Sequence, residues 1–578
     1  MARPEAEAEI HPLKAREAPA SPGSGARDAE KEAGGGAQPG RLSQWRTAAF
    51  FLSLYLCLGV AFAFSFVIPC PVRPTSRTAW SRAYDDAAAY AFLAAGDADR
   101  DRVQDLLVAF QAGPGSRNAS GADQEGSCSG GGFTTPCAFV AAHSGTNGST
   151  LWERPVAQEL LLMDCSMEHG GSPACLLVGN PASLTLLDLG TGQTRWNEAV
   201  SSGANSTVLS PLLKIPDIDK DGVPDFLVFT ATGQEIKSCF YSGTFGTQMK
   251  FSGSLHLPGL IGHLLHVTKS GAHYILFYTA KALFAYSLKE LYHMAAGPAS
   301  AALASLKEDA DWEMAMRHKA RQVPLASSGD IQYVTKMSEK SGSHILVATS
   351  AMLELVNGQQ LSSLWVVGVP HILRERRVKS QRCHQLIIIL CPACREPVLG
   401  AFGPDEIAVA IESRASHETK KVTIVEGSSG VIKWEVELHS EMQSPKPATL
   451  ATADRRSIFL FWGLYQDERN ETGSWHGSRQ QRLYLFHPSL PTVLLELSNS
   501  TEPIVAFEGL LFERSRHACY VLLAGPQVGS SPGRVVLSKR KLKEDIFSSH
   551  VIWLNQMPQD TDQNVRDYFH RMRFRTFG

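Results

Sequence analysis

The chain carries little charge for its length. Charged residues make up 19% of the 578 residues, and the formal net charge is −2 at pH 7. Binding to the phosphates of nucleic acid needs a basic face, so this balance excludes a nucleic-acid partner. Apolar residues reach 44%, which excludes wholesale disorder. The length therefore predicts either several domains or one large repeat domain.

Motifs for catalysis are scarce. The sequence has no HExxH, no Walker A and no dinucleotide-binding fingerprint. Cys391-Pro-Ala-Cys394 has the spacing of a zinc or redox pair, but no second CxxC or histidine pair completes a tetrahedral site. We therefore expect a protein that is not an enzyme, with no catalytic residues.

The first forty residues lack aromatic side chains and contain Ile10 and Leu13 as their large aliphatic residues. This composition predicts a disordered tail over 1–46. Residues 47–68 then run without a charge, and about 22 helical residues span roughly 33 Å, enough to cross a membrane. We predict an uncleaved transmembrane signal anchor here, followed by a juxtamembrane stalk over 69–84, because a cleaved signal peptide would be shorter and nearer the start.

Glycosylation motifs indicate which side of the membrane each end faces, since the flanking basic residues do not. Five N-x-S/T sequons follow the anchor and none precedes it: Asn118, Asn147, Asn205, Asn470 and Asn499. We predict a single-pass type II glycoprotein with a cytoplasmic N-terminus, at the cell surface or in the secretory pathway.

Cysteine usage agrees with an oxidising lumen. Cys128 and Cys137 lie close together in the sequence, as do Cys165 and Cys175. Each pair could close a short loop as a disulfide. We take these as two disulfide candidates and expect the remaining odd count to leave thiols unpaired.

The rest of the chain is rich in short apolar runs typical of β-strands. Several runs end in a similar turn, in which glycine precedes tryptophan or another large apolar residue. The turns are HSGTNGSTLWE (143–153), DLGTGQTRWN (188–197), YSGTFGTQMKF (241–251), LVNGQQLSSLW (355–365) and EGSSGVIKWE (426–435). We interpret each as a hairpin whose aromatic residue packs between neighbouring repeat units.

The spacing of these turns predicts a β-propeller. Gly145, Gly192 and Gly243 are 47 and 51 residues apart, which is the length of a blade. With further hairpins near 487–497 and 525–537, we predict an all-β ectodomain of seven or eight blades over 85–545. The longer gap from Gly358 to Gly430 contains a segment unlike its surroundings, so we predict an insertion at 375–395.

Two aspartate-rich loops could hold a metal ion. Asp217, Asp219, Asp221 and Asp225 alternate around Gly222, a pattern of hard oxygen ligands that suits Ca²⁺ in a β-hairpin loop. A turn capped by its own aspartates explains the same pattern. Asp97, Asp99, Asp101 and Asp105 form a weaker candidate, because Arg102 stands where the glycine should be and would disfavour the tight turn.

The C-terminal residues 546–578 contain four arginines near the end and we interpret them as a solvated tail. A short amphipathic helix that contacts a partner or lipid is the alternative.

The acidic loops PDIDKDGVPDFLV and GDADRDRVQDLLV resemble FG-GAP repeats, the calcium-binding blades of integrin alpha subunits. Longer strings, among them EAEIHPLK, GSTLWERPVAQ and HVTKSGAHYILF, resemble the integrin alpha FG-GAP repeat-containing family, also called the family with sequence similarity 234, over nearly the whole chain. The resemblance implies a glycosylated type II membrane protein with a propeller ectodomain and no established catalytic activity. In that family the pattern passes almost directly from HILR to PVLGAFG, where this chain has 375–395.

The leading hypothesis is a non-enzymatic membrane glycoprotein whose propeller binds another protein, with structural Ca²⁺ in a blade loop. One alternative is an enzyme, because the glycine–tryptophan hairpins also resemble quinoprotein blades; acidic and histidine side chains converging on the central channel would favour it. The other is a trafficking or chaperone accessory of a client membrane protein, which would co-purify with that client.

Overall fold

The computed structural model describes residues 41–67, 79–113, 115, 127–200, 206–298, 300–316, 320–339, 342–369, 397–404, 406–415, 419–439, 444–465, 480–512, 518–554 and 560–576. The chain divides into two units, Met1–Val72 and Arg73–Gly578. In the first unit, the helix α1 (Arg41–Val67) covers all but the last residue of the predicted anchor. Within the described residues, no helix has both the length and the apolarity needed to cross a membrane.

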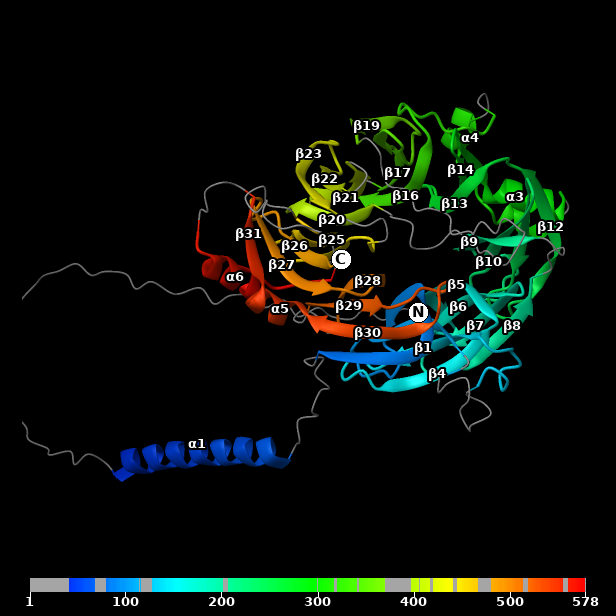
Figure 1. The fold of residues 1–578 in the computed structure, drawn as a ribbon. Helices are drawn as coiled ribbons and strands as arrows, with labels where there is room; N and C mark the ends of the chain where they lie inside the picture. Colours follow the sequence, from blue (N-terminus) through cyan, green and yellow to red (C-terminus); the bar gives the residue numbers. More distant parts are fainter. Residues whose placement is uncertain are drawn as a thin grey trace, which may run out of the picture. The chain divides into compact units, whose positions relative to one another are not determined.

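The second unit is a β-propeller with eight blades in its described residues, arranged in a ring in chain order (Figure 1). Blade 1 consists of β1 (Trp80–Gly96), β2 (Asp105–Ala112), β3 (Cys137–His143) and β4 (Thr150–Ala157). Blade 2 consists of β5 (Glu159–His169), β6 (Ser172–Asn180), β7 (Ser183–Asp188) and β8 (Thr194–Ala199). Blade 3 consists of β9 (Thr207–Lys214), β10 (Phe226–Thr232), β11 (Glu235–Tyr241) and β12 (Gln248–His256). Blade 4 consists of β13 (Leu260–Val267), β14 (His273–Thr279) and β15 (Leu283–Ser287). Blade 5 consists of β16 (Ile331–Glu339), β17 (Gly342–Thr349), β18 (Met352–Val356) and β19 (Ser363–Gly368). Blade 6 consists of β20 (Val398–Gly403), β21 (Glu406–Arg414), β22 (Thr419–Glu426) and β23 (Ile432–His439). Blade 7 consists of β24 (Ala448–Ala451), β25 (Ser457–Gly463), β26 (Gln481–Phe486), β27 (Val493–Ser500) and β31 (His550–Trp553). Blade 8 consists of β28 (Ile504–Leu511), β29 (Ala518–Ala524), β30 (Gly533–Lys541) and the first part of β1. The all-β propeller prediction is confirmed.

The strand β1 closes the ring because it belongs to two blades. Its first part pairs with β30 of blade 8, from Trp80 to Ala87, and its second part pairs with β2 of blade 1, from Ala87 to Gly96. The start and end of the propeller sequence are thus hydrogen-bonded to each other. This closure protects sheet edges that would otherwise template aggregation.

The early start of β1 corrects the predicted stalk over 69–84 at its C-terminal end. Trp80 and Tyr84 pack against the hydrophobic cluster of blades 1 and 8, so they belong to the propeller. Alternating polar residues in this strand hid it, because the strand lies at the outer edge of blade 8.

The core lies between adjacent blades. Middle strands such as β3 and β25 are buried along their whole length, while the outer strand β23 alternates buried and exposed residues. Side chains of neighbouring blades share clusters; Leu176 of blade 2 and Val228 of blade 3 lie in one of them. Burial on both faces explains why the middle strands are continuous apolar runs.

A tryptophan from one blade docks on the turn between the last two strands of the next blade. Four such pairs are Trp80 with Gly148, Trp152 with Gly192, Trp196 with Gly246, and Trp365 with Gly430. Gly192 adopts a φ of 66°, and a Cβ placed on it would lie 2.5 Å from the ring of Trp152. Both the backbone and the ring therefore require glycine there. The predicted hairpins, with an aromatic residue between units, are confirmed.

Blade 4 departs from this plan. After β15 the chain forms the helices α3 (Leu288–Ala296), η2 (Ala301–Ala304) and α4 (Ala310–Met316) before it returns. On its return, Arg321 and Val323 hydrogen-bond to the backbone of β15 as a short fourth strand. Gly243 and Gly358 are 115 residues apart, about two blade lengths, because this helical excursion replaces the glycine turn in blade 4.

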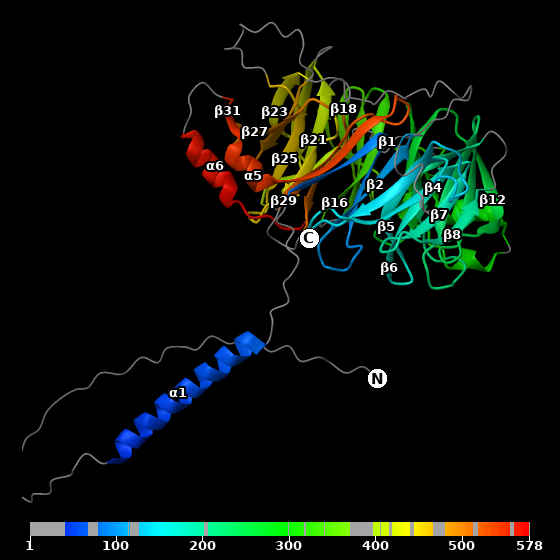
Figure 2. The ribbon, with the colours of Figure 1, turned by 60° about the horizontal axis from the view of Figure 1, so that its bottom comes forward.

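The described residues of the C-terminal segment, 546–554 and 560–576, are folded, which corrects the prediction of a solvated tail. After α5 (Leu542–Ser548), β31 adds a fifth strand to blade 7, and α6 (Asp562–Arg571) packs beside α5 (Figure 2). The side chains of Val565, Phe569 and Phe574 are buried in the same cluster as the strands of blades 7 and 8. Val565 and Phe569, which lie among charged residues in the sequence, therefore attach α6 to the hydrophobic core of blades 7 and 8.

Candidate metal sites in two aspartate loops

The two predicted aspartate loops occupy equivalent places in the fold. One joins β1 to β2 in blade 1, and the other joins β9 to β10 in blade 3. Each therefore connects the innermost strand of its blade to the second strand. The structure brings together Asp97, Asp99 and Asp101 in blade 1 and Asp217, Asp219 and Asp225 in blade 3; within each group, carboxylate oxygens lie within 4.8 Å of one another.

The last aspartate of each loop is a buried backbone clamp. Oδ2 of Asp105 accepts the N–H of Ala98 at 2.8 Å, and its Oδ1 accepts the N–H of Gly145 at 2.8 Å. Asp225 does the same with Ile218 at 2.7 Å and Gly243 at 3.1 Å. Burial raises the pKa of both carboxyls to about 6. Both side chains therefore tie their loop to the neighbouring hairpin turn.

Asp101 and Asp221 also hold the loops in matching ways. Oδ1 of Asp101 accepts the N–H of Val103 at 2.7 Å, and Oδ1 of Asp221 accepts that of Val223 at 2.8 Å. Burial acts to raise the pKa of Asp221, but hydrogen bonds from Thr244, Val223 and Ser242 outweigh it and hold this pKa below its usual value.

Arg102 does not prevent the tight turn, contrary to the expectation from the sequence. Arg102 has a φ of 70°, and the equivalent Gly222 has a φ of 91°. The Arg102 N–H reaches Oδ2 of Asp97 at 3.1 Å, as that of Gly222 reaches Asp217 at 2.8 Å. The carboxylate contact and the clamp at Asp105 hold the backbone in a conformation that arginine adopts at a cost.

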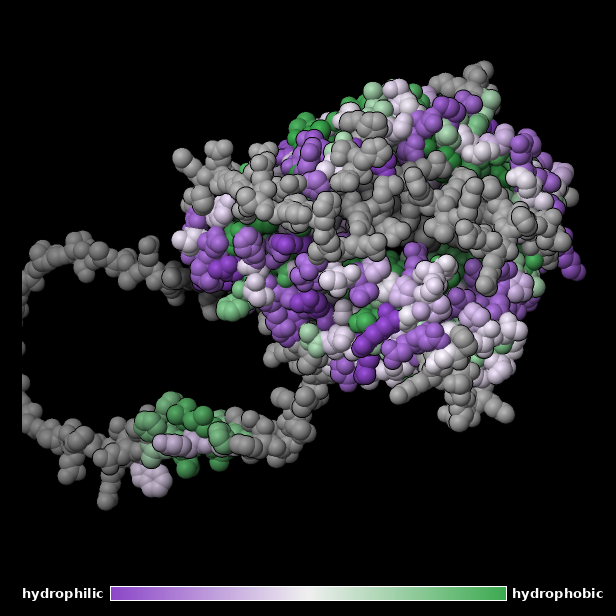
Figure 3. All heavy atoms as spheres, viewed as in Figure 1, coloured by the Kyte–Doolittle hydropathy of each residue, from purple (hydrophilic) through white to green (hydrophobic). Residues whose placement is uncertain are grey.

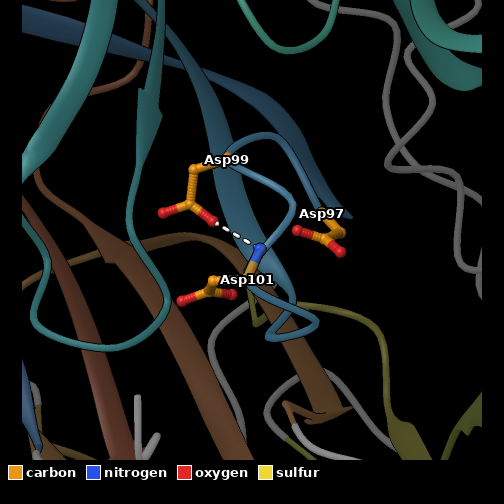
Figure 4. A group of neighbouring side chains, drawn as sticks. All are labelled: Asp97, Asp99 and Asp101. Atoms are coloured by element: carbon orange, nitrogen blue, oxygen red, sulfur yellow. Dashed lines mark hydrogen bonds between the residues drawn. The ribbon is translucent and has the colours of Figure 1, made fainter. Parts of the chain in front are cut away.

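The first aspartate distinguishes the two loops. Both oxygens of Asp217 accept backbone N–H groups. In contrast, Oδ1 of Asp97 is buried and has no hydrogen-bond partner among the described residues. Figure 4 shows Asp97, Asp99 and Asp101 around the turn, with the Asp101 N–H donating to Asp99 at 3.0 Å. A buried carboxylate oxygen without a donor is a position that a cation would satisfy.

Hydroxyl groups in the facing hairpin turns complete both sites and were missed from the sequence. Thr146 donates to Oδ2 of Asp101 at 3.1 Å, and Ser242 donates to Oδ2 of Asp221 at 3.1 Å. The repeated Ser-Gly-Thr at 144–146 and 242–244 was the available signal. Blade 2, which has no aspartate loop, has Asp-Leu-Gly at the same place, 188–190.

The covalent features of the ectodomain are placed as follows. Both predicted disulfides form, Cys128–Cys137 and Cys165–Cys175. The second disulfide joins β5 to β6 in blade 2. Blades 1 and 3 have their aspartate loops between the equivalent two strands.

Two of the sequons, Asn147 and Asn499, are exposed. Asn118, Asn205 and Asn470 lie outside the described residues, as do the predicted insertion 375–395 and its Cys391–Cys394 pair.

The fold and its closure define this chain as a β-propeller protein. The model of the FAM234A/B beta-propeller matches residues 80–575. The chain belongs to that family, which confirms the resemblance seen in the sequence.

Relatives of known name cover almost the whole chain. It is 41% identical over 576 residues to Protein FAM234A of Homo sapiens and of Rattus norvegicus, covering 99% of this chain and 98% of each of those proteins. It is 28% identical to Protein FAM234B of Gallus gallus, covering 94% of this chain and 85% of that protein.

Solved structures align at low similarity. The WD40 domain of SCAP from fission yeast aligns at 10% identity and a TM-score of 0.36, over 80% of this chain and 98% of that chain. The quinohemoprotein alcohol dehydrogenase ADHIIG from Pseudomonas putida HK5 aligns at 10% identity and a TM-score of 0.42, over 84% and 78%.

Proposed function

We propose that this chain is a non-enzymatic, membrane-anchored glycoprotein whose propeller binds another protein. Its membership of the non-catalytic FAM234A/B propeller family supports the absence of enzymatic activity. The anchor rests on the uncharged sequence 47–68, and Figure 3 colours the described residues of α1 mainly as hydrophobic. The disulfides and the exposed Asn147 and Asn499 support a lumenal or extracellular propeller.

An apolar strip on the outer strands of blades 5 and 6 supports protein binding most directly. Leu364 and Val366 of β19 are 47% and 40% exposed, and Val431 and Ile432 beside β23 are 53% and 38% exposed. Hydrophobic residues reach the surface at this rim (Figure 3). A group of exposed apolar residues on adjacent elements is typical of a docking surface.

The outer strand of blade 2 provides the contrast. In β8, the residues on either side of the docked Trp196 are Arg195 and Asn197. In β19, the residues on either side of the docked Trp365 are Leu364 and Val366. The docked tryptophan is thus shared, while the exposed positions beside it are polar in β8 and apolar in β19.

Site-specific crosslinking tests the strip. A photoreactive amino acid at position 366 of the full-length chain in cells should give a discrete adduct, and Leu364→Asp with Val431→Asp should abolish it. Thr194→Asp with Asn197→Asp on β8 is the matched control and should leave the adduct intact. Equal adducts in all three proteins would contradict binding at the strip.

The topology has its own test. Asn147→Gln and Asn499→Gln should each increase the electrophoretic mobility of the protein by the mass of one glycan, and glycosidase should erase the difference. The chain should also resist alkaline extraction from membranes. Release by alkali, or no glycan at either position, would contradict the type II arrangement.

We further propose that Ca²⁺ binds the aspartate loops and stabilises the blades. The blade 1 loop is the stronger site because Oδ1 of Asp97 has no donor among the described residues, while in blade 3 the carboxylates of Asp217, Asp219 and Asp225 come together. Ligand binding to the folded state raises the unfolding temperature. Calcium should therefore raise it in wild type, less in Asp217→Asn and least in Asp97→Asn. No rise at millimolar calcium would remove the metal from the proposal.

A further inference from the structure

The contact between blades 4 and 5 lacks the tryptophan that other blade contacts have. At three of those, the indole Nε1–H donates to the carbonyl of the second residue of the hairpin turn. These bonds are Trp80 to Gly145 at 3.3 Å, Trp152 to Leu189 at 2.8 Å, and Trp365 to Gly427 at 2.7 Å. In blade 5 the equivalent carbonyl, that of Gly358, accepts from Nε2 of His266 at 2.8 Å.

The N–H of the same turn residue is also held differently in blade 5. In blades 1 and 3 this N–H donates to the clamp carboxylates of Asp105 and Asp225. In blade 5 the N–H of Gly358 donates to Nδ1 of His344 at 3.4 Å. Both polar links of this turn therefore use imidazoles, where the turns above use an indole and, in blades 1 and 3, a carboxylate.

The imidazole of His266 is neutral in this role. His266 is fully buried, and its ring stacks on Trp312 with 5.1 Å between centroids. Because its Nε2 donates to a carbonyl, a further proton must go to Nδ1, which is buried without a partner among the described residues. His344 is 7% exposed, and its Nδ1 accepts the Gly358 N–H.

The charges around His266 disfavour its protonation. Lys336 on β16 and His344 on β17 both act against a second positive charge, while the Gly358 carbonyl favours it. Two carboxylates lie on or beside α4, and both are engaged elsewhere: Asp309 accepts from Ser270 and Gln359, and Glu313 pairs with Arg321 and Tyr274. Burial is the largest effect, and it lowers the pKa of His266 to about 4.

We propose that the contact between blades 4 and 5 is an acid-sensitive joint of the propeller ring, which opens locally when His266 is protonated. The tryptophan-locked contacts stay closed, because an indole does not titrate. The folded-state pKa of His266 lies below the usual value of 6.5. The joint is therefore fully stable at neutral pH and loses stability as the pH falls through 6.5 toward 4.

Opening of this joint would also change the surroundings of the apolar strip. A groove of about 570 Å³ lies over the joint, and its lining includes His266, His344, Val267 and Leu364. Leu364 is one end of the strip proposed above to bind a partner. Acid release of a partner would rest on that proposed function, but the opening itself does not.

Hydrogen exchange of the full-length chain in detergent micelles, at pH 7 and pH 5 with correction for intrinsic rates, measures the opening directly. If His266 alone governs it, the opening constant of segments 260–267 and 353–362 should rise about 20-fold on acidification. The contact between Trp365 and Gly430 is the internal reference and should change little. Equal changes at both contacts would overturn the proposal, even if partner binding at the strip had already failed its own test.

Variants that keep the hydrogen bonds but cannot titrate sharpen the test. The amide of His266→Gln can donate to the Gly358 carbonyl, and the amide oxygen of His344→Asn can accept the Gly358 N–H. The double variant should lose the pH response, while His263→Gln, at a buried histidine of blade 4 that contacts blade 3, should keep it. If the double variant retains the response, or His263→Gln abolishes it, the joint lies elsewhere. Should the double variant fail to fold, His266→Gln alone should lose the response.

Discussion

The contact between blades 1 and 2 and the contact between blades 4 and 5 solve one packing problem with different residues. In the first, Trp152 supplies both an apolar ring and an N–H donor, and Gly192 leaves room for the ring. In the second, Leu361 stands at the position of that glycine with a φ of 54° and is 2% exposed, while His266 supplies the donor. The turn backbone is the same in both, since the N–H of the fifth residue returns to the carbonyl of the first.

This comparison shows that glycine in these turns serves the partner ring as much as the backbone. Where blade 4 provides no tryptophan, a leucine occupies the left-handed conformation and fills the space from the other side. Trp152 both fills the space between its blades and donates a hydrogen bond. Between blades 4 and 5, Leu361 fills the space and His266 donates the hydrogen bond.

The largest expected effect comes from removing a docked tryptophan. Trp365→Ala should destabilise the fold by about 3–5 kcal/mol, through a cavity and the loss of the hydrogen bond to Gly427. Leu361→Ala should cost less, about 2–3 kcal/mol, because a smaller side chain is lost. Denaturant unfolding of both variants checks the order. If Leu361→Ala is the more damaging, the division of roles between Leu361 and His266 is wrong.

The parts of the fold that repeat along the sequence could be predicted from it, and the parts that do not repeat could not. A glycine turn followed by tryptophan or another large apolar residue was visible five times, so the propeller, the blade length and the interblade aromatics could be predicted. Blade 4 could not, because its helical excursion breaks the period and its contact uses Leu361 and His266, which match no repeated pattern. The aspartate loops were visible as loops, but the clamp role of Asp105 depends on a turn 40 residues away. The buried α6 was hidden among charged residues.

Adding a methyl group to Gly192 tests the steric half of the comparison. Gly192→Ala combines a left-handed backbone with a Cβ that would lie 2.5 Å from the ring of Trp152, so we expect a loss of about 3 kcal/mol. Combining it with Trp152→Ala should cost less than the sum of the single variants, because the clash disappears. Additive losses, measured by the same unfolding experiment, would show that the ring is not the reason for glycine.

Acidification tests the imidazoles on the other side of blade 4. His263 donates to the carbonyl of Pro211 in blade 3 at 2.8 Å, and burial lowers its pKa to about 4. Because the unfolded chain binds this proton more readily, stability falls as the pH drops from 6.5 toward 4, by about 2 kcal/mol at pH 5 for this site. His263→Gln should remove that share of the pH dependence of unfolding. An unchanged slope between pH 7 and pH 5 would mean that His263 stays neutral in both states.

The smallest effect is expected where a turn glycine has no neighbour. Gly222 in the blade 3 loop has a φ of 91°, but a Cβ there would meet nothing within 4 Å, and Arg102 already occupies the equivalent place in blade 1. Gly222→Ala should therefore cost only the backbone preference, about 1 kcal/mol. Measured beside Gly192→Ala without added metal, it separates the cost of the left-handed backbone from the cost of the clash. Equal losses in the two variants would attribute both to the backbone and would leave the tolerance of Leu361 without its steric explanation.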